Sequence, residues 1–321
     1  MVQIPDFSDV IEAAYRIESC VHHTPLFSST TLDRMVGAEI YFKPENLQKT
    51  GSFKARGACN AVLSLTEAEA NCGVATHSSG NHAQAIAYAA QLRGVQATIV
   101  MPEDAPSVKV AAVKEYGATI VWAGPHPLER ERQLELVVGE TGATFVHPSN
   151  DLQVIAGQGT AALELLEDIV LVSTRPPDII LVPVGGGGLL SGTALAVAGR
   201  DRGTRTIGVE PEMVDDAARS FRDGRIYPPT GAVTVADGLR TFLGDVNFPL
   251  IRRHVSDILT VTEQGIIVAM RLIWERLKLV VEPSSAVPVA ALFEHPEVFK
   301  GQRVGIVLSG GNVDLTDLTW W

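Results

Sequence analysis

The sequence has few of the features that mark several large classes of protein. Its 321 residues include three cysteines, Cys20, Cys59 and Cys72, without a Cys-x-x-Cys spacing, so neither a disulfide framework nor a zinc site is indicated. No apolar run approaches the roughly 18 residues that span a bilayer. Residues 1–6 carry no cation of the kind that begins a secretion signal. We therefore expect a cytoplasmic protein with no membrane partner.

Positive charge is also scarce. Lys and Arg together number 26 against 37 Asp and Glu, so the formal net charge is −11, and the basic residues form no cluster. An acidic chain of this kind is a poor candidate for binding nucleic acid or an anionic membrane. Internal repeats, low-complexity tracts and long linkers are absent as well. A globular protein of two domains fits this length better than one small core.

Short runs of Val, Ile and Leu alternate along the chain with segments of helical length. Such runs are typical of strands buried on both faces, and with intervening helices they indicate parallel α/β sheets. The predicted strands are Ala38–Lys43, Gly73–His77, Ala97–Met101, Thr119–Trp122, Thr144–Val146, Ile179–Val184, Thr206–Val209, Ile258–Val261 and Val304–Leu308. The clearest predicted helices are Asn81–Arg93, Ser107–Tyr116, Ala156–Leu171 and Gly265–Leu277. We expect a small domain over 71–149 and a large one over 1–70 and 150–321.

One lysine lies inside a run of small residues, Gly51-Ser52-Phe53-Lys54-Ala55-Arg56-Gly57. A lysine is a useful catalyst only when its amine is neutral or held as a Schiff base, which requires partial desolvation or a nearby cation. A lysine judged alone is more often a solvated surface residue. Three other segments rich in Gly and Ser favour the catalytic interpretation of Lys54.

Four glycines, Gly185–Gly188, follow the predicted strand Ile179–Val184 and precede the apolar segment Leu189–Val197. At a strand-to-helix turn, such a loop lets backbone N–H groups converge on an anion at the helix N-terminus. The spacing matches neither a dinucleotide-binding nor a Walker loop, so those phosphates are less favoured. The alternative is a tightly packed turn without a ligand.

Ser78-Ser79-Gly80-Asn81-His82 also follows a strand and precedes a helix. Its hydroxyl, amide and N–H groups are suited to holding a carboxylate. The alternative is an ordinary N-cap, in which Ser79 or Asn81 only begins the helix, and both interpretations can hold at once. A lone histidine is more often packed than catalytic, so we assign His82 to support of this loop and not to the role of a base.

Together with Ser309-Gly310-Gly311-Asn312, these segments resemble the pyridoxal-phosphate (PLP) enzymes of the tryptophan-synthase-β fold type. The resemblance is to the branch of serine/threonine dehydratases, serine racemases and threo-3-hydroxyaspartate dehydratases. It extends over nearly the whole chain, from His23–Leu26 to Val281–Ser285 and Ser309–Asp314. It implies fold type II, with two open, mainly parallel sheets flanked by helices and PLP in the cleft between the domains. It also implies a mobile small domain and a homodimer.

The resemblance assigns roles residue by residue. Lys54 would carry PLP as a Schiff base and move the Cα proton, and Ser79 would serve as acid or base on the opposite face of the substrate. Ser309 would face the pyridine nitrogen as a neutral partner, which suits β-elimination or racemisation more than transamination. The implied cofactor contacts are Phe53, Lys54, Asn81, Gly185, Gly186, Gly187, Gly188, Leu189, Gly238 and Ser309. The implied substrate contacts are Ser78, Ser79, Asn81, His82 and Arg130.

Two of the assigned features have ordinary alternatives. Arg130 matches an arginine that racemase relatives bring toward the substrate pocket, but Pro127–Arg132 also reads as a charged surface helix. Glu210, the carbonyl of Val214 and Asp216 match the ligands of a structural Mg²⁺ or Ca²⁺, which prefer oxygen donors. Their acidic segment would also suit a solvated helix start that the helix dipole favours.

The leading functional hypothesis is a PLP-dependent dehydratase of small β-hydroxy amino acids, with L-threonine or L-serine as first candidates. A close variant acts on threo-3-hydroxyaspartate, with Arg130 pairing the second carboxylate. A third possibility is a serine racemase that uses Ser79. A non-catalytic amino-acid sensor on the same fold is the alternative from another class.

Overall fold

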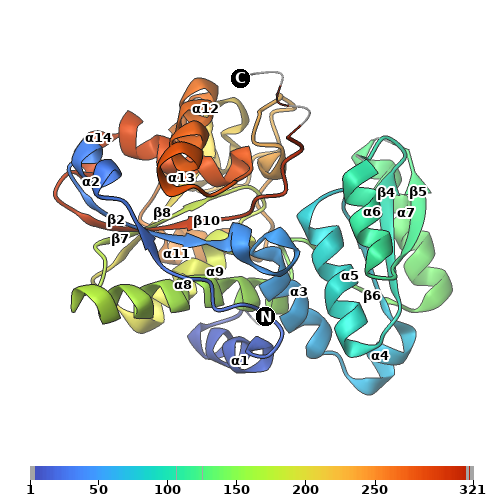
Figure 1. The fold of residues 1–321 in the computed structure, drawn as a ribbon. Helices are drawn as coiled ribbons and strands as arrows, with labels where there is room; N and C mark the ends of the chain where they lie inside the picture. Colours follow the sequence, from blue (N-terminus) through green and yellow to red (C-terminus); the bar gives the residue numbers. More distant parts are fainter. Residues whose placement is uncertain (1–3, 106, 125, 316–317, 319–321) are drawn as a thin grey trace.

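The computed structural model describes residues 4–105, 107–124, 126–315 and 318. Two α/β bodies of unequal size lie side by side in Figure 1. The larger contains a six-stranded sheet and the smaller a four-stranded sheet. This arrangement confirms the predicted fold class of two mainly parallel sheets flanked by helices.

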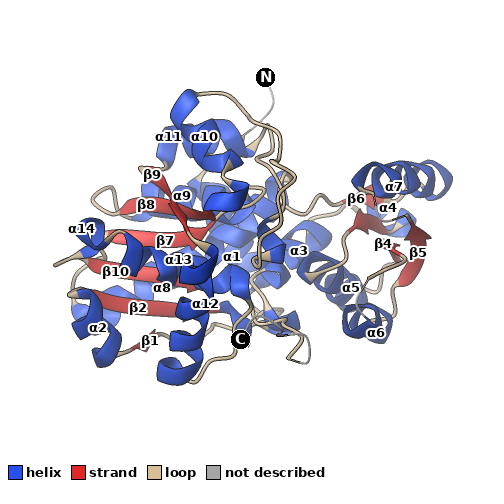
Figure 2. Ribbon diagram, turned by 90° about the horizontal axis from the view of Figure 1, so that it is seen from above, coloured by secondary structure: helices blue, strands red, loops and turns tan. Residues whose placement is uncertain are grey.

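The large sheet has the strand order β1-β2-β10-β7-β8-β9, which can be followed in Figure 2. Only β1 runs antiparallel to its neighbour, and the other neighbouring strands pair in parallel. Strands β7 and β10 are buried along their whole length, as expected of parallel strands that are covered on both faces. Their bounds are β1 Phe27–Ser28, β2 Glu39–Pro44, β7 Ile179–Pro183, β8 Arg205–Pro211, β9 Asp257–Val261 and β10 Arg303–Leu308.

Successive residues of these strands pack against opposite helical layers, because side chains alternate across a strand. Ile179 and Leu181 contribute to a core shared with α2, α12, α13 and α14. Ile180 and Val182 contribute to a core shared with α8, α9, α10 and α11, and α1 packs outside α8 and α9. The bounds are α1 Phe7–Ile17, α2 Thr30–Val36, α8 Leu152–Ser173, α9 Gly188–Arg200, α10 Asp216–Asp223, α11 Asn247–His254, α12 Glu263–Leu272, α13 Pro283–Glu294 and α14 Pro296–Phe299.

The small sheet is entirely parallel, in the order β5-β4-β3-β6. One face carries Val74 and Ile99 against helices α5 and α6, and the other carries Ala75 and Val100 against α7. The bounds are β3 Val74–His77, β4 Ala97–Pro102, β5 Thr119–Ala123, β6 Thr144–Phe145, α4 Glu67–Cys72, α5 Asn81–Arg93, α6 Ser107–Glu115 and α7 Pro127–Thr141. No helix among the described residues is long and apolar enough to cross a membrane.

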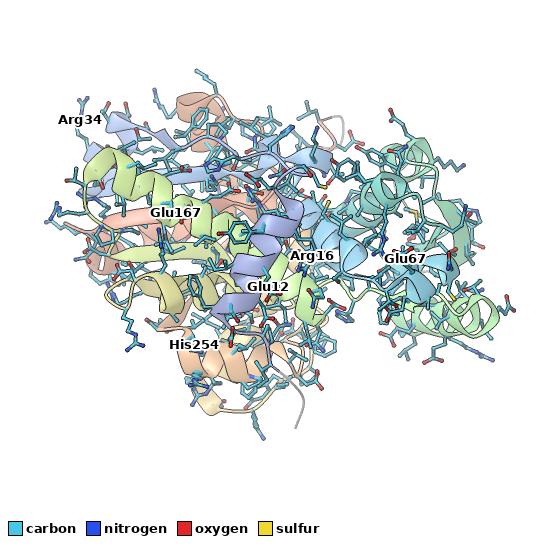
Figure 3. The ribbon with its side chains drawn as sticks, turned by 90° about the horizontal axis from the view of Figure 1, so that it is seen from below. Glu12, Arg16, Arg34, Glu67, Glu167 and His254 are labelled. Carbon is cyan, nitrogen blue, oxygen red and sulfur yellow. The ribbon has the colours of Figure 1, made fainter. Side chains whose placement is uncertain are left out.

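Helix α3, Lys54–Leu63, joins the two bodies. It packs against α5 of the small body and α8 of the large one, and it lies between them in Figure 1. Arg16 of α1, labelled in Figure 3, donates from Nη1 to Asn60 Oδ1 of α3 at 2.5 Å. The division of the chain at residues 70 and 150, and the mobility of 71–149, remain predictions.

All nine predicted strands are present, with ends shifted by at most two residues. Helix α8 begins four residues before the predicted start, because Asp151 accepts a hydrogen bond from Val154 N and caps it. Helix α12 ends at Leu272, and the chain continues to Leu277 as a π-helical turn. Sequence periodicity does not separate such a turn from an α-helix.

A buried ion-pair network fixes the first turn of α3. Arg56 Nε lies 2.7 Å from Glu45 Oε2, and Arg56 Nη1 lies 2.6 Å from Glu164 Oε1 of α8. Lys43 Nζ of β2 lies 2.8 Å from Glu164 and 2.9 Å from Asp168. The side chains of Lys43, Glu45 and Arg56 are completely buried. Burial of charge is tolerated here because each group has opposite charges within hydrogen-bond distance.

We predict that Arg56→Ala lowers the free energy of unfolding by about 3–5 kcal/mol, because it leaves Glu45 buried without its cation. Urea denaturation followed by tryptophan fluorescence measures this change. The matched control is Arg202→Ala, on an exposed turn, which should stay within about 0.5 kcal/mol of the wild type. Equal stability of the two variants would contradict the role given to the network.

Candidate active site

Lys54 is the first residue of α3 and follows two short 3₁₀ turns, η1 Glu45–Leu47 and η2 Lys49–Gly51. Thr50 has φ 57° and Gly51 φ 71°, and a left-handed conformation is uncommon for a residue other than glycine. Phe53 N donates to Ser309 O at 3.0 Å, which ties this turn to the end of β10. The turn that precedes Lys54 is therefore joined to a segment more than 250 residues away in sequence.

The Lys54 amine lies between the two bodies. Its Nζ donates to Pro148 O, just after β6, at 2.7 Å, and lies 5.1 Å from the centre of the Phe53 ring. Burial lowers the pKa of Lys54 to about 8, although the charge of Glu282 opposes the shift. A lysine with this pKa is half neutral at about pH 8, whereas an unperturbed lysine is half neutral only at about pH 10.4.

The glycine loop connects β7 to α9, and all four of its glycines are buried. A Cβ on Gly186 would lie 2.3 Å from Ser149 Oγ, and one on Gly185 would lie 2.9 Å from Thr241 Oγ1. Gly187 has φ 90°, which favours glycine. Neighbouring side chains and the backbone conformation therefore leave no room for a residue larger than glycine at these positions.

The donors of this loop are available for an anion. Within the described part of the chain, the N–H groups of Gly185, Gly186 and Gly187 have no hydrogen-bond acceptor. A side chain of α11 fixes the orientation of the loop: Asn247 Nδ2 donates to Gly186 O at 3.0 Å and to Ser149 O at 2.8 Å. Buried N–H groups without partners at the start of a helix fit a phosphate.

The segment Ser78–His82 connects β3 to α5 and faces the large body. Asn81 Nδ2 donates to Glu282 Oε1 at 2.9 Å, and Asn81 Oδ1 accepts from Asn312 Nδ2 at 2.8 Å. Gly80 N donates to Ser78 Oγ at 3.2 Å, which shapes the turn. The loop thus reaches both the strand-end segment after β10 and the start of α13.

The His82 side chain points into the small body. Its Nε2 lies 3.1 Å from Val146 O and therefore donates, while Nδ1 has no partner among the described residues. Burial, together with the charge of Lys54, holds the pKa of His82 well below its usual value. The ring is neutral and engaged in the core, so it supports the loop.

Ser309 is buried at the end of β10, with its Oγ 3.0 Å from Ser285 Oγ. Ser285 Oγ also donates to Gly310 O and accepts from Gly310 N, each at 2.6 Å. Gly238, in the 3₁₀ turn η4 Asp237–Leu239, donates from N to Ser284 Oγ at 3.2 Å. Leu189 lies in the first turn of α9 and is almost fully buried.

Glu282 is a site residue to which the sequence interpretation gave no role. It is buried between Asn81 and the segment after β10, and its N donates to Gly310 O at 3.1 Å. Burial raises the pKa of Glu282 to about 7, with the hydrogen bond from Asn81 opposing the rise. In the sequence, the only signal for Glu282 was its place in the segment Val281–Ser285 that resembles the family. No local pattern links it with its partner Asn81, which lies 201 residues away.

Arg130 lies on α7, on the face of the small sheet opposite α5 and α6. Its Nε is buried and has no hydrogen-bond partner among the described residues. Burial, and then the charge of Arg130, lowers the pKa of His77 at the end of β3. Arg130 Nε therefore lacks a hydrogen-bond partner among the described residues, and the arginine acts electrostatically on His77, the residue before the Ser78–His82 loop.

Glu210 and Asp216 lie at the end of β8 and the start of α10. The two Glu210 oxygens accept from Ala217 N at 3.1 Å and Ala218 N at 2.9 Å, while Asp216 Oδ2 is buried without a partner among the described residues. Burial, followed by the Asp216 charge, raises the pKa of Glu210 to about 9, and burial raises that of Asp216 to about 7. Val214 ends the 3₁₀ turn η3, Glu212–Val214, between them. The described residues contain no cluster of three or more His, Cys, Asp or Glu suited to a metal, so a cation here would need backbone and water oxygens as well.

The residues around Lys54 thus come from both bodies: the Gly185–Gly188 loop, Ser309, Asn81 and Glu282 meet there, while Glu210 and Asp216 form a separate pair.

The family described as "Pyridoxal-phosphate dependent enzyme" matches residues 17–310. The β-hydroxyaspartate dehydratase of Paracoccus denitrificans is 47% identical over 317 residues, covering 99% of both chains. The crystal structure of serine racemase from Dictyostelium discoideum has a TM-score of 0.92 and 45% identity over 97% of this chain and 99% of that one. The crystal structure of a threonine deaminase from T.th. has a TM-score of 0.91 and 46% identity, with the same coverages.

We predict that Gly186→Ala weakens retention of PLP by about tenfold or more, because the added Cβ overpacks the loop against Ser149 at a cost of about 1–3 kcal/mol. Cofactor absorbance after dialysis at a series of PLP concentrations measures the affinity. Gly139→Ala is the control, since it lies on α7 and its Cβ would meet nothing within 4 Å. Unchanged retention in Gly186→Ala would contradict the assignment of this loop.

Proposed function

Because this chain belongs to the family of pyridoxal-phosphate dependent enzymes, we propose that it is an ammonia-lyase that converts a small β-hydroxy amino acid to a 2-keto acid and ammonia. The observation that carries the proposal is the Lys54 amine, whose pKa is lowered to about 8 where the two bodies meet. We also propose a cytoplasmic homodimer, on the resemblance alone.

PLP, when bound, supplies a sink for the electron pair that remains when the substrate loses its Cα proton. The unpartnered N–H groups of Gly185–Gly187 are our proposed phosphate site. The Ser309 hydroxyl is the proposed neutral partner of the ring nitrogen, and Asn81 the proposed partner of the ring oxygen. Phe53, Leu189 and Gly238 are proposed to line the ring.

Lys54 is the proposed base for the Cα proton. Its amine is partly neutral near pH 8, and Pro148 O orients it from the small body. The β-hydroxyl leaves with a proton, so water is lost, and the subsequent hydrolysis returns one water and releases ammonia. General acid–base catalysis is most effective when the pKa of the group lies near the working pH.

The substrate α-carboxylate is proposed to dock on Ser78–His82, at the N-terminus of α5. The positive end of the helix and its free N–H groups favour an anion there. Ser79 lies in the same loop and is the proposed proton donor or acceptor on the side of Cα opposite Lys54.

Among the candidate substrates we place threo-3-hydroxyaspartate first. The sequence alone favoured L-threonine and L-serine, but two observations support a second carboxylate. Arg130 has a buried Nε without a partner among the described residues, and an arginine in that state is suited to pairing a carboxylate. Relatives 47% identical to this chain are named for hydroxyaspartate, from Paracoccus denitrificans and from Pseudomonas sp..

Serine racemisation is the second candidate, because Ser79 is suited to return a proton on the other face and several relatives at 43–46% identity are named serine racemases. In this case Ser79→Ala should suppress formation of D-serine and spare the elimination reaction.

We predict that the purified PLP-loaded protein releases ammonia and keto acid from threo-3-hydroxyaspartate at least about tenfold faster than from L-serine or L-threonine, in terms of kcat/KM. Arg130→Ala should remove that preference, with Arg132→Ala on the same helix as the control. Chiral analysis of the L-serine samples from the wild type and Ser79→Ala tests the racemase alternative. Absence of turnover on all three substrates would refute the lyase, and appearance of D-serine would then favour the second candidate.

A divalent cation, Mg²⁺ or Ca²⁺, is proposed between Glu210 and Asp216, with the Val214 carbonyl as a third ligand. Two observations support it: Asp216 Oδ2 is buried without a partner among the described residues, and the pKa values of both carboxyls are raised because burial disfavours their charge. A cation would stabilise both carboxylates in their ionised form. Since protons compete with the cation for a group whose pKa is raised, its effect should grow as the pH rises.

We predict that Mg²⁺ or Ca²⁺ raises the thermal midpoint of the wild type, and more so at pH 8.5 than at pH 6.5. Asp216→Asn should lose most of this shift because it removes one charged ligand. Differential scanning fluorimetry in chelator and in the metal ion measures it, with Asp223→Asn at the exposed end of α10 as the control. A shift that persists in Asp216→Asn would place the cation elsewhere.

A further inference from the structure

Lys109 lies on α6 of the small body, and its Nζ is 3.3 Å from Asp237 Oδ2 in the turn η4 of the large body. The Lys109 side chain is only 22% exposed, against 53% for that of Asp237. The ion pair therefore spans the two bodies and leaves the lysine the more enclosed of the two partners.

The Lys109 ammonium lies over the Ser78–His82 loop. A Cβ on Gly80 would be 3.9 Å from Lys109 Nζ and, its two chain neighbours aside, would meet no other heavy atom of the described residues within 4 Å. Space between the loop and the lysine is thus open on this side. The charge of Lys109 also acts on the buried Glu282 carboxyl, where it opposes the rise in pKa that burial causes.

The Lys109 ammonium has N–H donors left to bind a second anion. A lysine has three N–H donors and no acceptor, and within the described residues Lys109 uses its ammonium for Asp237 alone, at a distance that is long for a charged hydrogen bond. A carboxylate held at the start of α5 would lie within reach of the remaining donors. The lysine would then bridge Asp237 and the ligand.

We propose that Lys109 binds the substrate α-carboxylate on the Ser78–His82 loop, with Asp237 holding the lysine in place. The inference rests on the proposed function, because it requires a carboxylate on that loop. Arg130 lies on α7, on the opposite face of the small sheet. The two cations therefore serve different carboxylates: Lys109 the one that every amino acid carries, and Arg130 the one that hydroxyaspartate adds.

The test compares binding of glycine and glycinamide to the PLP-loaded protein by titration of the cofactor absorbance. Glycine carries the α-carboxylate and no β-hydroxyl, so its affinity is independent of which substrate is turned over, and glycinamide lacks the charge. Lys109→Gln removes the cation at similar length, and Lys109→Arg keeps it. Lys114→Gln, on the exposed side of the same helix, is the matched control.

We expect Lys109→Gln to weaken glycine binding by about tenfold or more and to leave glycinamide binding within about threefold. Lys109→Arg should recover most of the affinity for glycine, and Lys114→Gln should match the wild type. Equal losses for glycine and glycinamide would mean that Lys109 only supports the structure, and unchanged glycine binding would mean that it does not touch the carboxylate. Either result would overturn the proposal even if ammonia release is confirmed.

Discussion

The buried guanidinium of Arg56 holds together three segments that position the site. Through Glu45 it fixes the turn that precedes Lys54, and through Glu164 it joins that turn to α8, the longest described helix of the large body. Lys43 extends the same network into β2. Because α3 also packs against α5, the orientation of the small body depends on this turn as well. A charge network that is costly to bury is therefore used where the position of one lysine has to be set accurately.

Around that lysine the structure combines groups whose protonation is shifted by burial and groups that carry no charge. Burial lowers the pKa of Lys54 to about 8 and raises that of Glu282 to about 7, so both titrate near neutral pH. Ser309 and the glycine loop provide only neutral hydroxyl and N–H groups. Positive charge is proposed to come from Lys109 and Arg130, whose helices α6 and α7 lie on opposite faces of the small sheet. Such a site is suited to moving protons on a bound, negatively charged amino acid.

Much of the fold could be predicted from the sequence, since runs such as Ile179–Val184 and Val304–Leu308 are buried on both faces and read directly as parallel strands. The loops that follow those strands were also recognisable, because Gly and Ser are needed where backbone N–H groups must be free. The pairs that join the loops could not be found, because no local pattern links Asn81 with Glu282, Arg56 with Glu164 or Lys109 with Asp237. The pairs Asn81–Glu282 and Lys109–Asp237 are set by how the two bodies pack, and Arg56–Glu164 by how α3 packs on α8. Arg130 on a charged helix read equally well as a surface residue, because the sequence does not show that its Nε is buried.

The central claim is that Lys54, and no other lysine, holds PLP at the junction of the two bodies. Borohydride reduction of the PLP-loaded protein, followed by proteolysis and mass spectrometry, locates the attached cofactor directly. The account predicts one modified peptide, with the phosphopyridoxyl group on Lys54. Label on another lysine, with Lys54 unmodified, would contradict it.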